Sequence, residues 1–185
     1  MLSVLHEMKP KNDFFESSSD SPVAQMSDQE FLQAKATYFG LMTEIDEQLG
    51  RIFDYLKATN QYDSTLIVFT SDHGEQLGDH YLFGKLGYFD ASYHIPLIIR
   101  DPKRQLQNVK TLEHFSESVD VMPTILDWLG MEIPDQCDGR SLLPFLENEV
   151  PRNWREEVHS EFDFRWIGSY QPMIEERFGL LPDCL

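Results

Sequence analysis

Apolar side chains recur at helical spacing from Ser27 to about Lys57, the longest patterned segment of the chain. Residues three and four positions apart share one face of an α-helix, so the pattern predicts a long amphipathic helix. Ser27 and Glu30 have the spacing of a capping box, which indicates where the helix begins. The apolar positions are Phe31, Ala34, Tyr38, Leu41, Ile45, Leu49, Ile52, Phe53 and Leu56. We expect this face to pack on a β-sheet and cover it, with no role in chemistry.

Two short apolar runs, at positions 65–69 and 96–100, predict strands of that sheet. The first run follows the long helix after a turn at 60–64, and this order favours a parallel sheet covered by helices. A third segment, 157–164, alternates apolar and polar residues loosely, as an edge strand does. The expected fold class is therefore α/β, with a helix-covered mixed, largely parallel sheet.

Two later segments predict short helices. Asp120 is suited to cap the first, which carries Pro123 in its first turn and ends at Gly130. Ser141 opens the second, which runs to Leu146. We expect Ile125, Leu126, Trp128 and Leu129 on the buried side of the first helix.

The remaining segments suggest how the chain is organised. Positions 1–26 are polar, contain serine and proline, and are expected to form an irregular arm. We expect 27–150 to form a portion of the α/β domain. Positions 151–185 are expected to be an extension that forms an incomplete edge of the same domain.

Charge and composition exclude several classes of function. The formal net charge of −17 argues against nonspecific binding to nucleic acid or to anionic membranes. No apolar run approaches the roughly 20 residues that span a bilayer, and no signal peptide is evident at the start. With only two cysteines, a disulfide framework is not expected. These observations favour a cytoplasmic protein that binds neither nucleic acid nor membrane.

The candidate chemistry follows the first predicted strand. Asp72 and His73 are adjacent in a polar loop at the carboxyl end of that strand, where open sheets keep their binding crevices. One carboxylate oxygen and one imidazole nitrogen can bind the same divalent cation. Gly74 and Gly78 allow the loop to bend sharply. The alternative is an ordinary solvated loop with a helix cap.

Six ordered segments extend the pattern beyond this loop. They are TYFGLMTEIDEQLG at 37–50, TSDHGEQLGDH at 70–80, GKLGYFDAS at 84–92, IPLIIRDP at 95–102, VDVMPTILDWLG at 119–130 and DGRSLLP at 138–144. Together they resemble the sulfatase and phosphonate monoester hydrolase family of the alkaline phosphatase superfamily. The resemblance implies a partial alkaline-phosphatase-like (sulfatase) fold and a small anionic ester as substrate.

The resemblance also implies roles for individual residues. Asp72 and His73 match a ligand pair for a divalent metal, for which manganese or calcium suits the donors better than magnesium or zinc. Lys85 matches a catalytic lysine that contacts the anionic substrate. The family's nucleophile, a formylglycine made within a Cys/Ser-x-Pro-x-Arg motif, has no counterpart, because neither Cys137 nor Cys184 is followed by that proline and arginine. We therefore expect a carboxyl-side portion of a metal-dependent ester hydrolase that is inactive alone.

Other residues of the loop have weaker assignments. Glu75, Asp79 and His80 are candidates to orient the metal ligands through hydrogen bonds, although loop acids are mostly solvated. His94 is expected to be buried, and the segment 88–92 either lines a pocket or packs through its aromatic rings. Two non-catalytic alternatives remain: a metal-binding module, or a structural remnant that pairs with a separate N-terminal half or with itself.

Overall fold

The computed structural model describes residues 22–85, 88–104, 111–147 and 149–160. Its first element is the short helix α2 (Pro22–Gln25), which lies in a stretch expected to be irregular. The long helix α3 (Asp28–Ala58) follows and begins where the capping box predicts. Glu30 accepts hydrogen bonds from the backbone N–H of Ser27 at 2.8 Å and from its hydroxyl at 2.7 Å. The predicted start of the helix is therefore confirmed.

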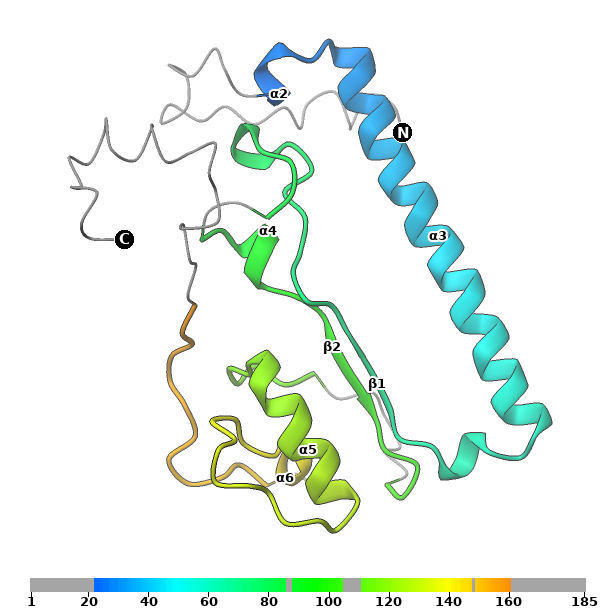
Figure 1. Cartoon of the computed structure of the whole chain (residues 1–185), viewed down its shortest axis with the longest axis vertical. Helices are drawn as coiled ribbons and strands as arrows, with labels where there is room; N and C mark the ends of the chain where they lie inside the picture. The colour runs from blue at the N-terminus through cyan, green and yellow to red at the C-terminus, as the bar shows by residue number, and fades with distance from the viewer. Residues whose placement is uncertain (1–21, 86–87, 105–110, 148, 161–185) are drawn as a thin grey trace.

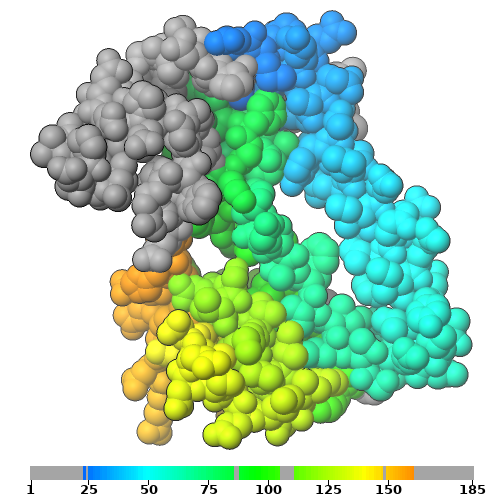
Figure 2. All heavy atoms as spheres, viewed as in Figure 1, coloured from blue at the N-terminus to red at the C-terminus, as the bar shows by residue number. Residues whose placement is uncertain are grey.

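Helix α3 does not cover the sheet, so that expectation is wrong. Figure 1 shows α3 standing beside the strands, and the space-filling view leaves an opening between the middle of the helix and the rest of the molecule (Figure 2). Only Phe31 and Lys35 are buried among the residues of α3. Exposed apolar side chains of the helix include Phe39, Leu41, Met42, Ile45, Ile52 and Tyr55. The sheet in the described residues has two strands and is too narrow for all 31 residues of the helix to pack on it.

The two predicted strands form an antiparallel pair. Strand β1 (Ile67–Thr70) aligns with β2 (Leu97–Arg100), so that Ile67 faces Arg100 and Thr70 faces Leu97. The sequence predicts a largely parallel sheet, and a mixed sheet contains antiparallel pairs as well. The described part of the chain between the strands forms the short helices η2 (Asp79–Tyr81) and α4 (Asp90–Tyr93). Neither is a crossover helix of the kind that usually joins parallel strands.

The core of the second half lies between two short helices. The single turn η3 (Ser118–Asp120) leads into α5 (Val121–Trp128), and α6 (Leu143–Leu146) follows. Phe145 is 1% exposed, and Leu142 and Leu143 are also buried. The hydroxyl of Thr124 accepts the backbone N–H of Leu142 at 2.9 Å, which joins the two helices. Both predicted helices are present.

The end of the described chain differs from the expected strand. Residues 157–160 do not belong to a strand, and residues 161–164 of the predicted segment lie outside the described residues. In Figure 1 residues 149–160 leave the α5–α6 region and run toward α4. Among the described helices, none combines the length and apolar character that a membrane crossing requires.

Candidate functional site

Asp72 and His73 lie in the loop that leaves β1, as the sequence predicts. The hydroxyl of Ser71 donates to the carbonyl of His73 at 2.7 Å, which holds the turn. The Nδ1 atom of His73 lies 2.7 Å from the carbonyl oxygen of Gly74. Because a carbonyl only accepts, this contact places the proton on Nδ1 and leaves the Nε2 lone pair for a ligand. Nε2 is 3.6 Å from the Asp72 carboxylate.

The loop is closed by Glu75 and Gln76. One carboxylate oxygen of Glu75 accepts the backbone N–H of Gly84 at 2.6 Å and that of Leu77 at 3.2 Å. The backbone N–H of Gln76 donates to the carbonyl of Gly84 at 2.9 Å. These contacts hold the two ends of the loop together. Lys85, the next residue in the chain, is thereby brought back toward Asp72.

Gly74 permits the loop to approach α4 closely. A Cβ atom at this position would lie 2.0 Å from the carbonyl oxygen of Ala91, a distance that real side chains do not adopt. The backbone N–H of Gly74 also donates to the carbonyl of Ser92 at 2.8 Å. Glycine is therefore needed here for packing, in addition to the bend that the sequence suggested.

A cavity of about 600 Å³ brings the three predicted site residues together. Asp72, His73 and Lys85 all line it. Its other lining residues are Ser92, Tyr93 and Ile95, residues 116–119 and residues 158–160. Burial raises the pKa of Asp72, but the charges of His73 and Lys85 and the N–H of His73 outweigh it, so this pKa lies below its ordinary value. The site therefore favours an ionised carboxylate beside two nitrogen groups.

The remaining predicted residues lie around this cavity rather than in it. Asp79 and His80 are not among its lining residues, and the His80 ring stacks on Phe89 with centroids 3.8 Å apart. His94 is exposed, so its expected burial is wrong; it follows the last residue of α4 and points into no core. Tyr88 stacks on Tyr93 at 5.6 Å, whereas Ser92 lines the cavity.

The ligand set of a complete metal centre is not present in the described part of the chain. No group of three or more histidine, cysteine, aspartate or glutamate side chains is close enough to hold an ion among those residues. A larger hollow of about 830 Å³ lies along the first turns of α3 and carries Glu30 as its one acid. Asp72 and His73 are thus a pair of donors that requires others to complete a coordination sphere.

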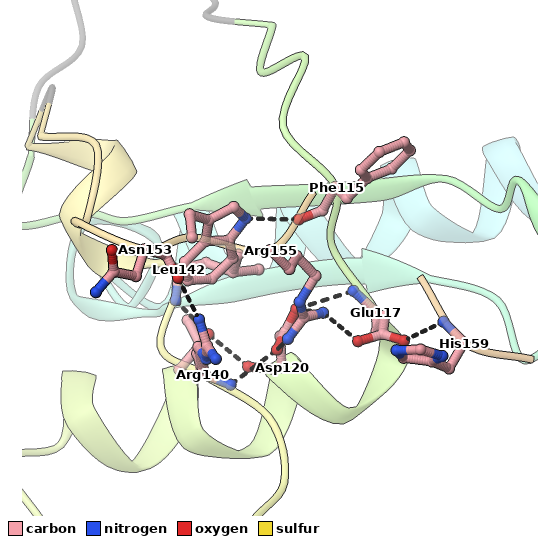
Figure 3. A network of polar contacts seen from close by, with 10 residues as sticks. Phe115, Glu117, Asp120, Arg140, Leu142, Asn153, Arg155 and His159 are labelled. Carbon is pink, nitrogen blue, oxygen red and sulfur yellow. Dashed lines mark hydrogen bonds and ion pairs between the residues drawn. The ribbon is translucent and has the colours of Figure 1, made fainter. Parts of the chain in front are cut away.

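A buried ion network joins Glu117 and Asp120 to Arg155, and no local sequence pattern predicted it (Figure 3). The carboxylate of Asp120 has no exposed surface and receives both guanidinium arms of Arg155 at 2.7 Å. Arg155 also contacts Glu117 at 2.6 Å. Asp120 accepts the backbone N–H groups of Glu117 and Arg140, each at 2.8 Å. The Asp120 side chain is therefore committed to this network and does not cap α5.

His159 joins the cavity through the same network. Its backbone N–H donates to Glu117 at 2.9 Å, and its residue lines the cavity. The sequence connected His159 to no chemistry, because 42 positions separate it from Glu117 and no local pattern links them. Only the folded chain brings residues 158–160 beside 116–119.

Comparisons with known proteins identify the family of this chain. A protein-family model described as Sulfatase matches residues 5–131. The chain is 55% identical over 162 residues to the multifunctional alkaline phosphatase superfamily protein PehA of Trinickia caryophylli, covering 88% of this chain and 31% of that protein. It is 37% identical over 134 residues to an arylsulfatase of Clostridium perfringens, covering 71% of this chain and 28% of that protein.

Two solved structures share the fold. The phosphonate monoester hydrolase SpPMH from Silicibacter pomeroyi has a TM-score of 0.75 and 46% identity, covering 85% of this chain and 30% of that one. The phosphonate monoester hydrolase of Agrobacterium radiobacter has a TM-score of 0.76 and 43% identity, covering 86% of this chain and 31% of that one. The chain thus spans about a third of the length of these relatives. It belongs to the sulfatase family of the alkaline phosphatase superfamily and has a partial α/β fold.

Proposed function

We propose that this chain supplies the metal-binding and anion-binding portion of a hydrolase of phosphonate monoesters, phosphate diesters or sulfate esters. The supporting observation is that Asp72, His73 and Lys85 line a single cavity. A carboxylate and an imidazole are donors to a divalent cation, and an ammonium group attracts an anionic ester. The three roles also match the site residues implied by the resemblance.

The donors fit a divalent metal of borderline to hard character. Asp72 would bind through an oxygen and His73 through Nε2, which the contact of Nδ1 with Gly74 leaves available. Manganese or calcium suits such a pair better than magnesium or zinc. Bound there, the cation would supply positive charge to the ester oxygens. Lys85 would hold a second anionic oxygen and stabilise charge that develops during reaction.

Glu75 is assigned a positioning role and not direct contact with the ester. Its carboxylate accepts the N–H of Gly84, the residue before Lys85, and so fixes where the Lys85 side chain begins. Asp79 is exposed and His80 is stacked on Phe89, so neither is assigned a direct part. Neither residue is proposed to contact the metal ligands.

The chain alone is proposed to be inactive. Covalent ester hydrolysis of the type implied by the resemblance needs a nucleophile, and the sequence lacks the Cys/Ser-x-Pro-x-Arg motif. The metal pair is also incomplete among the described residues. Measured turnover of an aryl phosphonate or aryl sulfate by the pure chain, dependent on added metal, would contradict this proposal.

The exposed face of α3 supports a second candidate function, that of a remnant that associates with a separate N-terminal half. Six large apolar side chains of this helix are between 47% and 63% exposed. Exposed apolar surface of this extent marks an interaction surface or an aggregation hazard. This candidate predicts association without any requirement for metal, which separates it from the first.

Metal binding tests the first candidate directly. Mn²⁺ added to the isotopically labelled chain should broaden the NMR signals of His73 and its neighbours, because paramagnetic relaxation falls off steeply with distance. The substitutions Asp72→Asn and His73→Gln should each abolish this broadening. Asp79→Asn and His94→Gln are matched controls, since both residues are exposed and neither lines the cavity. Broadening that survives the first pair, or that is lost equally in the controls, contradicts the site.

A further inference from the structure

We propose that residues 116–119 and 158–160 form the subsite for the uncharged organic group of the ester. This inference rests on the proposed function, in which Asp72, His73 and Lys85 bind the anionic centre. Both segments line the same cavity as those three residues. An ester has a charged part and an organic part, and the cavity offers surfaces of both kinds.

The wall made by these segments has an apolar surface without a partner in the described structure. Val119 is 51% exposed and Val158 is 45% exposed, and both line the cavity. Tyr93, which is 38% exposed, and Ile95 add further apolar surface to the lining. Ligand sites combine such apolar walls with a few polar groups that orient the ligand.

The polar groups of the wall carry little uncommitted charge. The two carboxylate oxygens of Glu117 are taken by Arg155 at 2.6 Å and by the backbone N–H of His159 at 2.9 Å. The hydroxyl groups of Ser116, Ser118 and Ser160 are neutral. The imidazole of His159 also lies in this wall, and its Nε2 atom is 3.8 Å from the carboxylate of Glu157. Among the described lining residues Lys85 is the one lysine or arginine, so an uncharged ring or chain on this wall would meet mainly valine and serine side chains.

The buried network fixes the shape of this wall. Arg155 is 10% exposed and is bound by Asp120 and Glu117, which ties the segment leading to 158–160 onto the segment 116–120 (Figure 3). The indole N–H of Trp154 donates to the carbonyl of Phe115 at 2.7 Å and adds a second tie. Burying an ion pair costs desolvation free energy, and removing one partner would leave a buried charge uncompensated, so the intact pair holds the two segments in one arrangement. A fixed wall is what selective binding of an organic group requires.

Gly139 contributes to the same arrangement from behind. A Cβ atom at this position would lie 2.0 Å from the carbonyl oxygen of Val119. The absence of a side chain lets the 138–140 turn approach the wall, and Arg140 then donates its N–H to Asp120. The wall is thus held by contacts from three separate parts of the chain.

Three probes separate the subsite from the anion site. Methylphosphonate carries the anion with a minimal organic group, phenol carries a ring without the anion, and phenylphosphonate carries both. Each is titrated into the labelled chain with the diamagnetic ion Ca²⁺ present, and the affinity and the shifted amide signals are recorded. We expect phenylphosphonate to bind about fivefold more tightly than methylphosphonate, as partial burial of one ring predicts. Its ring protons and those of phenol should give NOEs to the methyl groups of Val119 and Val158.

Val158→Gln tests the wall without placing a charge beside the anion. Since Val158 is 45% exposed, its replacement is not expected to prevent folding. The preference for phenylphosphonate should fall to less than about twofold, because the apolar contact is lost, and the affinity for methylphosphonate should be unchanged. Val150→Gln is the matched control, as Val150 is 58% exposed and does not line the cavity.

The outcomes distinguish the two proposals. Equal affinity for the two phosphonates, ring NOEs elsewhere in the molecule, or a preference that Val158→Gln leaves intact would overturn the subsite. If methylphosphonate leaves Asp72, His73 and Lys85 unshifted in the presence of Ca²⁺, the proposed function is wrong. Phenol that still contacts Val119 and Val158 in that case would support the subsite on its own.

Discussion

At the scale of single residues, buried charge separates the structural groups from the functional ones. Asp120 and Arg155 are buried and fully engaged, whereas Asp72 is 83% exposed in its side chain and Lys85 is exposed. A group whose hydrogen bonds are all made within the protein holds the fold in place. An exposed charged group on a cavity is free to meet a ligand. The cavity of this chain uses both kinds.

Replacing Asp120 tests the structural kind. Asp120→Ala leaves the buried guanidinium of Arg155 with Glu117 as its remaining acid and removes acceptors from two backbone N–H groups. We expect the free energy of unfolding to fall by about 3 kcal/mol, measured by urea denaturation. Asp135→Ala, at an exposed aspartate, should stay within about 0.5 kcal/mol of the parent chain. Similar losses in both variants would contradict the importance of the network.

At the scale of elements, each helix and turn is held by a small number of polar contacts. Helix α3 begins at a complete capping box. The C-terminal end of β2 is held by Asp101, the residue that follows it. Asp101 is 7% exposed and accepts the indole N–H of Trp128 at 2.8 Å and the backbone N–H of Lys103 at 2.9 Å. It also pairs with Arg104. These contacts join the end of β2 to α5.

The start of α3 should depend on Ser27. In Ser27→Ala the first turn loses an acceptor for the N–H of Glu30 and a donor to its carboxylate, which should destabilise the helix by about 1 kcal/mol. Hydrogen exchange of amides 28–32 should become faster, since this helix has few tertiary contacts to compensate. Thr43→Ala, in the exposed middle of the same helix, should slow or preserve exchange, because alanine has the higher helix propensity. Unchanged exchange in Ser27→Ala would show that the cap is not needed.

Stability should depend on pH through Asp101. Burial raises the pKa of Asp101, but the hydrogen bonds from Trp128, Arg104 and Lys103 outweigh it and hold the pKa below its ordinary value. A carboxyl group with a lowered pKa in the folded state stabilises the fold above its unfolded pKa of about 3.9. That stabilisation is lost as the pH falls through the lower, folded pKa.

Urea denaturation between neutral and acidic pH checks this dependence. The parent chain should lose stability steeply below about pH 4, and Asp101→Asn should be less stable at neutral pH with a flatter acid limb. Asp46→Asn, at an exposed position on α3, should retain the steep limb. An acid limb in Asp101→Asn as steep as that of the parent chain would assign the dependence to other groups.

At the scale of the whole molecule, the described chain forms one part of a larger fold. Helix α3 contacts the rest of the molecule mainly at its ends. The ring centroids of Phe31 and Phe83 lie 6.2 Å apart near the start of the helix. Those of Phe53 and Tyr62 lie 6.3 Å apart near its end. The middle of the helix exposes its apolar residues. The chain covers 31% of the length of PehA.

This exposed face should drive association of the isolated chain. We expect the sedimentation coefficient to rise with concentration in the micromolar range, because apolar surface that is removed from water stabilises contact. The double substitution Ile45→Gln and Ile52→Gln should shift the chain toward the monomer, since both side chains are more than half exposed. Met131→Gln, at a position 56% exposed outside α3, is the control. Association that the double substitution leaves unchanged would place the interface elsewhere.

Local patterns predicted the elements of this protein well. The capping box located the start of α3, apolar runs located β1 and β2, and Gly130, with a φ of 70°, ends the α5 region as predicted. These features depend on residues within a few positions of one another, so the sequence carries them directly. The loop suggested Asp72 and His73 as a metal pair, the resemblance implied a role for Lys85, and all three line one cavity in the structure.

Contacts between distant segments could not be read from the sequence. Asp120 was assigned to a helix cap, and its pairing with Arg155 across 35 positions had no local signal. The antiparallel pairing of β2 with β1 also depended on how the chain between the two strands turns, and so did the exposure of His94. Each of these outcomes depends on which surfaces meet in space.

The sequence by itself determined helices α3, α5 and α6, the two strands, the polar loop after β1 and membership of the family, because periodicity and motifs are local properties. Tertiary structure alone decided that α3 stands away from the strands and that residues 158–160 join the cavity. It also decided that Asp120 belongs to a buried network. The physical reason is that burial and ion pairing are free-energy balances over neighbours in space, and a chain specifies those neighbours only when it folds.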